Sequence, residues 1–170
     1  MIVLCPGMHT PEVSESFRTR FTPLHSHLHC FIPEAIAPYD GSAICQHVQN
    51  HCESNTPLVL MGFSAGAVGA RYAAQALHHQ GWAIAALWLW DGWGVPRLGE
   101  PFPTVRLSHD TFTHWSSALL GEGDDSFWAD PAVPHLDLWR NPEQIRGWRS
   151  LGSGLQERIS LLEFAADVLS

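Results

Sequence analysis

Short apolar runs alternate along the chain with segments of helical periodicity. Five such runs stand at residues 2–5, 28–32, 58–63, 82–90 and 104–107. Runs that are apolar throughout are typical of parallel strands covered on both faces, and the helical segments between them supply the crossovers. The alternation therefore predicts βαβ units and a parallel sheet.

Helices are expected wherever apolar residues recur at helical spacing between these runs. The expected helices span residues 11–21, 42–52, 65–79, 111–120 and 155–169. The last has apolar residues at positions 155, 159, 162, 165, 166 and 169, which is typical of an amphipathic helix. Residues 92–103 form a Gly/Pro-rich loop in this interpretation, and residues 126–142 are irregular.

The composition is that of a globular protein and excludes several function classes. With 170 residues, 45% of them apolar and 15% charged, residues 1–170 are expected to form a single domain. The net charge is −8 and the nine basic residues are scattered, which argues against nucleic-acid binding. All nine are arginines, so lysine Schiff-base chemistry and a P-loop lysine are excluded.

Neither a membrane span nor a secretory signal is expected from the sequence. No segment approaches the roughly 18 apolar residues that a spanning helix needs, and the first residues lack the basic start and long apolar stretch of a signal peptide. The four cysteines include no CxxC pair. A cytoplasmic protein with reduced thiols is the simplest interpretation.

A candidate nucleophile lies where the most apolar run meets a strong helical segment. Residues 62–66 read Gly-Phe-Ser-Ala-Gly and match the pattern G-x-S-x-G around Ser64. A strand-to-helix junction is where a nucleophile elbow must lie, because the tight turn needs small flanking residues. The free N–H groups of the following helix favour negative charge beside the serine.

Here the chain resembles the α/β-hydrolase family. The resemblance covers most of the chain and rests on the residues around Ser64, on the early strand at residues 2–9, and on the order of acid and base along the chain. It implies a reduced α/β-hydrolase fold with about five to six mostly parallel strands and helices on both faces. No cap helix is expected in the short link before residue 104, so the site would be open or covered by a partner.

The resemblance also implies an oxyanion hole made of backbone N–H groups. In this family an early strand ends in a His-Gly-type turn, and here Pro6-Gly7 stands at that place. By this match the N–H groups of Met8 and Ala65 would stabilise the oxyanion. Because both donors belong to the backbone, the identity of these side chains is only loosely constrained.

The family order of serine, acid and histidine suggests the other two catalytic residues. Asp110 follows the run at 104–107, and His135 lies 25 residues further on. Strand ends project such groups onto one edge of a parallel sheet. Asp91, which ends the run at 82–90, is the alternative acid. His114 is the alternative base, but its place four residues after Asp110 suits the role less well.

Aromatic residues cluster beside the proposed catalytic residues. Trp93, Phe112, Trp115 and Trp139 are candidates for an apolar substrate pocket, although tryptophans can equally fill the core of a small protein. Trp88 and Trp90 alternate with leucines on a buried strand, so at least one of them is expected in the core.

Two histidine clusters raise the question of a metal site. His25, His27 and His29 alternate, and His47 and His51 are four residues apart with Cys52 beside them. Neither cluster has the HExxH or CxxC signature of a zinc protein, so no metal and no cofactor is expected.

The function that these patterns favour is that of a serine hydrolase acting on a carboxylic ester or thioester. Ser64 would attack the acyl carbon, His135 would carry the proton, and Asp110 would orient His135. The expected partner is a small-molecule substrate with an apolar acyl or alkyl group; nucleic acid is not expected, and the oligomeric state is open. The alternative is a non-catalytic scaffold of the same fold that binds an apolar ligand or a protein.

Overall fold

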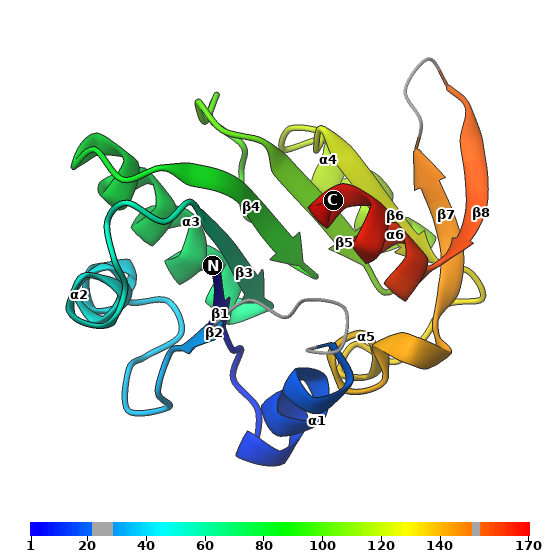
Figure 1. Ribbon diagram of the computed structural model, residues 1–170. Coiled ribbons are helices and arrows are strands. Elements are labelled where there is room, and N and C mark those ends of the chain that lie inside the picture. The colour runs from blue at the N-terminus through cyan, green and yellow to red at the C-terminus, as the bar shows by residue number, and fades with distance from the viewer. Residues whose placement is uncertain (22–28, 151–153) are drawn as a thin grey trace.

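A computed structural model describes residues 1–21, 29–150 and 154–170, and it contains one eight-stranded sheet (Figure 1). The strand order is β2-β1-β3-β4-β5-β6-β7-β8. The strands from β2 to β6 are parallel, and β7 and β8 complete the sheet as antiparallel neighbours. Their bounds are β1 Ile2–Cys5, β2 His29–Phe31, β3 Leu58–Phe63, β4 Ile84–Trp90, β5 Thr104–Ser108, β6 Asp125–Ala129, β7 Arg146–Ser150 and β8 Gln156–Ser160.

Helices cover both faces of this sheet, as the sequence predicted. Side chains of α1, α5 and α6 belong to the apolar cluster on one face, and those of α2 and α3 belong to the cluster on the other. The helices are α1 Pro11–Phe21, α2 Gly41–His51, α3 Ala65–His79, α4 Thr111–Ala118, α5 Asp137–Arg140 and α6 Leu161–Leu169, with a 3-10 turn η2 at Pro142–Gln144. The expected α/β fold class with helices on both faces is therefore confirmed, although the sheet has eight strands where about five to six were expected. None of the described helices is long and apolar enough to cross a bilayer.

The central strands are apolar throughout because successive side chains enter opposite cores. On β4, Trp88 and Trp90 pack into the cluster of α1, α5 and α6, whereas Leu87 and Leu89 pack into the cluster of α2 and α3. Both tryptophans are fully buried. Trp139 is fully buried beside them, with its ring stacked on Phe17 at a centroid distance of 3.6 Å.

The C-terminal part of the chain differs from the expectation of one helix over residues 155–169. Gln156–Ser160 is instead the edge strand β8, and helix α6 begins at Leu161. Its start is fixed by a capping box, in which the Ser160 hydroxyl accepts from the Glu163 N–H and the Glu163 carboxylate accepts from the Ser160 N–H. Two more strands were not expected: β7, which pairs with β8, and β6, which lies where an irregular segment was expected.

The link between β4 and β5 contains no cap. Residues 91–103, all of them described, contain no helix. The link is tied down by Glu100, whose buried carboxylate accepts from Arg71 Nε on α3 at 2.8 Å and from the Leu98 N–H at 3.0 Å. Buried Arg106 donates to the carbonyl oxygens of Val95 and Gly121, each at 2.8 Å.

Replacing Glu100 with alanine should lower the free energy of unfolding by about 2–4 kcal/mol, because Arg71 would keep its charge in a partly buried place with no partner. Urea unfolding curves of the two proteins measure this difference. Glu53→Ala is the control, since Glu53 is exposed, and it should change stability by less than about 0.5 kcal/mol. Equal losses in the two variants would contradict a stabilising role for the Arg71–Glu100 pair.

Candidate active site

Ser64 lies in the turn between β3 and α3 with a backbone that side chains rarely adopt. Its φ and ψ are 53° and −121°, and its N–H donates to the Trp90 carbonyl oxygen at 2.8 Å. Such a conformation costs about 1–3 kcal/mol and persists only where the surrounding structure enforces it. Strain of this kind is the hallmark of a nucleophile elbow, and it is found here at the serine that the sequence singled out.

The two glycines beside Ser64 are required by close approach of the backbone. A Cβ on Gly62 would lie 2.5 Å from the Gly66 carbonyl oxygen. A Cβ on Gly66 would lie 2.3 Å from the Cys5 carbonyl oxygen and 2.4 Å from that of Pro6. Strand β3, helix α3 and the turn after β1 therefore meet at distances that admit hydrogen atoms only.

The turn after β1 borders the elbow, as the sequence predicted. A Cβ on Gly7 would lie 3.1 Å from Ser64 Cβ, and the Gly7 N–H faces His9 Nε2 at 3.3 Å. Met8, the next residue, has an exposed side chain. Ala65 is the first residue of α3, where N–H groups have no partner inside the helix. The structure thus brings the Gly7-Met8 segment and the Ala65 N–H to the same edge as Ser64.

Asp91 follows β4 and is held rigidly. Its φ is 50°, its N–H donates to the Leu107 carbonyl oxygen at 2.7 Å, and its side chain is only 1% exposed. Carboxylate Oδ1 accepts from the His109 N–H at 2.8 Å. A buried carboxylate needs such donors, and the remaining ones come from two imidazole rings.

His135 is the first of these rings, and its Nδ1 lies 2.7 Å from Asp91 Oδ2. Because a carboxylate only accepts, Nδ1 carries the proton, and a neutral ring then has a free lone pair on Nε2. The ring stacks on Phe63 at a centroid distance of 4.8 Å and is about half exposed. The loop that carries it is tied to the end of β5 by a hydrogen bond from the Val133 N–H to the His109 carbonyl oxygen.

The acid beside His135 is therefore Asp91, the alternative, and not Asp110. Asp110 caps α4 instead: its Oδ1 accepts from the Thr113 N–H at 2.6 Å. Burial opposes ionisation of Asp110, but the hydrogen bonds from Thr113 outweigh it and hold the pKa of Asp110 below its usual value. The second oxygen of Asp110 lies 3.5 Å from His109 Nε2, and among the described residues Asp110 has no hydrogen bond or ion pair with His135.

His109 is the second ring on Asp91, and the sequence analysis missed it. Its Nδ1 lies 2.8 Å from Asp91 Oδ2, so both imidazoles approach one carboxylate oxygen. The Asp91 carboxylate raises the pKa of His109 above its usual value, although burial opposes this. Its position directly after β5, next to Asp110, was the signal that could have identified it.

The raised pKa of His109 predicts a pH-dependent contribution to stability. His109 stabilises the fold fully below its unfolded pKa of about 6.5, and this contribution is lost as pH rises through the higher folded pKa. The difference in unfolding free energy between wild type and His109→Gln should therefore be constant below about pH 6 and shrink as pH rises above about 6.5, as measured by urea titrations at several pH values. An NMR titration of the His109 ring with a midpoint below 6.5 would contradict this.

His114, the alternative base, lies away from Ser64. Its ring stacks on Trp128 at a centroid distance of 4.0 Å, and it lines a small separate cavity with Arg106. Burial lowers the pKa of His114. The helix α4 that carries it turns this side chain towards β6. The histidines that share the cavity with Ser64 and lie against Asp91 are His135 and His109.

A cavity of about 450 Å³ joins these groups at the C-terminal edge of the sheet. It is lined by Ser64, Ala65, Val68, Asp91, Trp93, His109, Phe112, Thr113 and His135. Two of the expected pocket aromatics, Trp93 and Phe112, are thus in the wall. Trp115 lies outside it, 6.2 Å from the Phe112 ring, and Trp139 is a core residue.

The described residues contain one group that could hold a metal ion, and it coincides with this site. Ligand atoms of Asp91, His109 and His135 lie within 4.8 Å of one another. Asp91 Oδ2 has a hydrogen bond with His135 Nδ1, whereas His109 Nδ1 lies 2.8 Å from the same oxygen without the geometry of a hydrogen bond. Of the histidine clusters weighed from the sequence, His25 and His27 lie outside the described residues. The rings of His47 and His51 stack, with His51 Nδ1 2.7 Å from the His47 carbonyl oxygen.

No model of a known protein family matches the chain, and no curated protein is significantly similar to it. Among solved structures it is similar to YbtT, a type II thioesterase from the yersiniabactin NRPS/PKS biosynthetic pathway, with 18% identity and a TM-score of 0.43. That match covers 51% of this chain and 39% of the thioesterase. A protein from Pectobacterium atrosepticum described as a YdeN-like hydrolase matches with 19% identity and a TM-score of 0.48, over 71% of each chain. Neither likeness is close enough to supply a function.

The fold type follows from the chain's own geometry. A parallel sheet carries a strained Ser64 between its third strand and the following helix, and the aspartate and histidine follow in that order from later strand ends. That is the arrangement found in α/β hydrolases. The fold is therefore that of the α/β hydrolases, as the sequence resemblance implied.

Proposed function

We propose that this chain is a serine hydrolase that cleaves carboxylic esters or thioesters, with Ser64 as nucleophile, His135 as base and Asp91 as acid. The observation that carries the proposal is the Asp91–His135 hydrogen bond of 2.7 Å in the wall of the cavity that also contains the strained Ser64. A base held by a carboxylate, in a cavity that also contains a serine, is the arrangement that activates serine.

The reaction begins with attack of Ser64 Oγ on the acyl carbon. His135 Nε2 takes the hydroxyl proton as the C–O bond forms, and the carbonyl π electrons move onto oxygen. Among the described residues no hydrogen bond joins Ser64 to His135 in the free protein. Such bonds are often long before substrate binds and shorten in the complex. Collapse of the intermediate expels the alcohol or thiol, which takes the proton from His135, and water repeats the cycle to release the acid.

The backbone N–H groups of Met8 and Ala65 would stabilise the negative charge on the oxygen of the tetrahedral intermediate. The Gly7-Met8 turn is fixed against the elbow by the close contacts of Gly7 and Gly66, so the donors need no rearrangement during the reaction. The N-terminus of α3 adds the positive end of the helix dipole at the same place.

Asp91 would serve His135 in two ways. It fixes the tautomer with the proton on Nδ1, and its negative charge stabilises the imidazolium that forms during attack. The His109 N–H on the other carboxylate oxygen keeps the Asp91 carboxylate in this orientation. His109 is then a positioning residue, since it acts through Asp91.

The substrate class follows from the cavity wall. Val68, Trp93 and Phe112 give it an apolar side, and all three are largely exposed to solvent in the free protein. An acyl or alkyl group that covers them would remove apolar surface from water, worth about 25 cal/mol per Å². We therefore expect a small-molecule substrate with an apolar group. The four cysteines are all free thiols, which suits a reducing compartment such as the cytoplasm.

Labelling with a fluorophosphonate, read by intact-protein mass spectrometry, tests the proposal. Wild type should gain one adduct, because an activated serine attacks phosphorus and expels fluoride. Ser64→Ala should gain none. Ser42→Ala is the matched control, since Ser42 is exposed on another helix, and it should be labelled like wild type. A panel of p-nitrophenyl esters and acyl thioesters of rising chain length then ranks the substrates.

An adduct that persists on Ser64→Ala would overturn the assignment of the nucleophile. A folded wild type that gains no adduct would overturn the hydrolase itself and leave the non-catalytic scaffold, which binds an apolar ligand or a protein, as the better explanation.

A further inference from the structure

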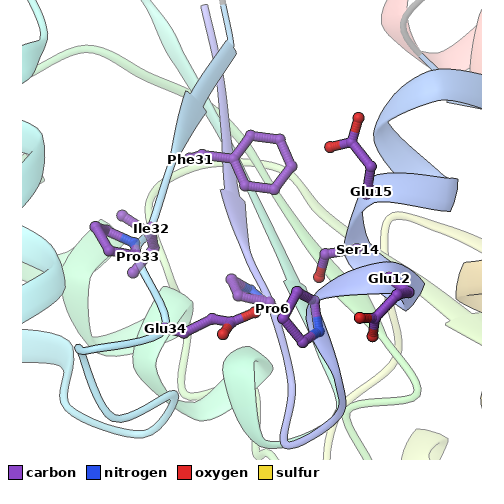
Figure 2. A pocket seen from close by; sticks show the side chains of 9 residues that line it. Pro6, Glu12, Ser14, Glu15, Phe31, Ile32, Pro33 and Glu34 are labelled. Carbon is purple, nitrogen blue, oxygen red and sulfur yellow. The ribbon is translucent and has the colours of Figure 1, made fainter.

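A second and larger cavity lies beside the turn after β1, on the side away from β4. Its volume is about 730 Å³, within the range of small-molecule sites. Helix α1 forms one wall and the segment that ends β2 forms the other, with Pro6 between them (Figure 2). Nothing in the proposed catalytic cycle uses this space.

Most of the lining is apolar. The residues concerned are Pro6, Pro11, Phe31, Ile32 and Pro33. Ile32 is buried and Phe31 is partly buried, so the floor of the cavity is anchored in the protein. Three of the five residues are prolines, whose fixed φ keeps the walls rigid and lowers the entropy lost when a ligand binds. Such a lining suits a hydrocarbon chain.

The lining also contains a buried hydroxyl group without a hydrogen-bond partner. Ser14 on α1 is only 7% exposed, and its Oγ has no hydrogen-bond partner among the described residues. Figure 2 shows this oxygen turned away from the helix, towards the space between Phe31 and Pro6. A buried polar atom left unpaired costs free energy, so a ligand that supplies a hydrogen bond there gains affinity.

Carboxylates stand around the apolar lining. Glu12 and Glu15 come from α1, and Glu34 comes from the opposite wall. Glu15 pairs with Arg18, but no described Arg or His forms an ion pair with Glu12 or Glu34. The Thr10 side chain donates a hydrogen bond to Glu12 and lowers its pKa, so this carboxylate is charged at neutral pH. The charge at the cavity mouth is therefore negative, and it is not neutralised by the described part of the chain.

We propose that this cavity binds an aliphatic amine, with the hydrocarbon chain against Phe31 and the prolines and the ammonium group near Glu12, Glu34 and Ser14. An ammonium donates three hydrogen bonds and accepts none, which matches two carboxylates and a hydroxyl oxygen. A carboxylate or phosphate ligand would be repelled there. The net charge of −8 attracts cations to the protein as a whole.

Binding of n-hexylammonium and of 1-hexanol to the wild-type protein, followed by amide chemical shifts in NMR, tests the proposal. Hexylammonium should cause saturable shifts in the first turns of α1 and at Phe31 and Glu34. Its affinity should exceed that of hexanol about fivefold or more, because the two probes share a hydrocarbon chain and differ in charge. Equal affinities, or shifts that centre on Ser64, would overturn the proposal.

Three variants separate the parts of the site. Glu12→Gln/Glu34→Gln should weaken hexylammonium about fivefold and leave hexanol unchanged, since exposed carboxylates contribute modestly. Ser14→Ala should also weaken hexylammonium, and it removes an unpaired hydroxyl without creating a large void. Glu53→Gln, an exposed carboxylate remote in sequence, is the control for net charge. If it weakens hexylammonium as much as the double variant, general charge attraction explains the binding and the site is wrong.

The proposal does not depend on Ser64 being a nucleophile. Neither probe can be hydrolysed, so the binding result and the fluorophosphonate result fail or succeed separately.

Discussion

Replacing Ser64 with alanine should lower kcat/KM on a p-nitrophenyl ester by about ten-thousand-fold to a million-fold. Alanine removes only the oxygen that would attack the acyl carbon. Without that oxygen no acyl intermediate can form on residue 64. Stopped assays over hours with nanomolar wild type and micromolar variant cover the required range. The residual rate measures what the oxyanion donors and binding contribute without a nucleophile.

The fold should be nearly unaffected by this change. The strained backbone at Ser64 is imposed by its neighbours, and alanine keeps the Cβ that causes the strain. Urea unfolding should therefore give a free energy within about 1 kcal/mol of wild type. A variant that retains more than a tenth of the wild-type activity would show that Ser64 is not the nucleophile.

Most of the parallel strands could be predicted from the sequence because they are buried on both faces, but the parallel strand β6 was interpreted as irregular. A strand such as Leu58–Phe63 has no face in contact with solvent, so its sequence is an unbroken apolar run. The nucleophile elbow was predictable for a related reason, since only glycine fits at Gly62 and Gly66 where three backbones meet. At these positions the sequence motif and the tertiary contacts both require glycine.

The antiparallel edge could not be read in the same way. Arg146–Ser150 and Gln156–Ser160 expose much of their length, so polar residues interrupt the apolar pattern. The apolar residue at position 159 fits a helix as well as a strand, and this merged β8 with α6 in the prediction. The capping pair Ser160 and Glu163 was a local signal for the true start of the helix.

The sequence favoured Asp110 as the acid, whereas the structure places Asp91 against His135. Asp91 and Asp110 both follow strands, and chain order does not separate them. The local clue lay in the helix that begins at Thr111, because an aspartate directly before a helix is an N-cap. What brings His135 to Asp91 is a tertiary contact, the hydrogen bond from the Val133 N–H to the end of β5, which no sequence pattern reports.

Asparagine at position 91 should lower kcat by about ten-thousand-fold with little change in KM, whereas asparagine at position 110 should leave both within about threefold. The Asp91 side chain meets His135 Nδ1, and an amide there cannot stabilise the imidazolium and can favour the wrong tautomer. Steady-state kinetics of the two variants on one ester gives the comparison directly.

The two substitutions are matched because asparagine is tolerated by the backbone at both places. At position 91 the φ of 50° is one that asparagine adopts readily. At position 110 asparagine caps a helix as well as aspartate does, so the hydrogen bond from the Thr113 N–H is kept. A loss of activity in either variant therefore reports on the carboxylate at that position, both its charge and its second acceptor oxygen. If Asp110→Asn were the inactive variant, the catalytic acid would be the one first expected from the sequence, and the Asp91–His135 pair would be structural.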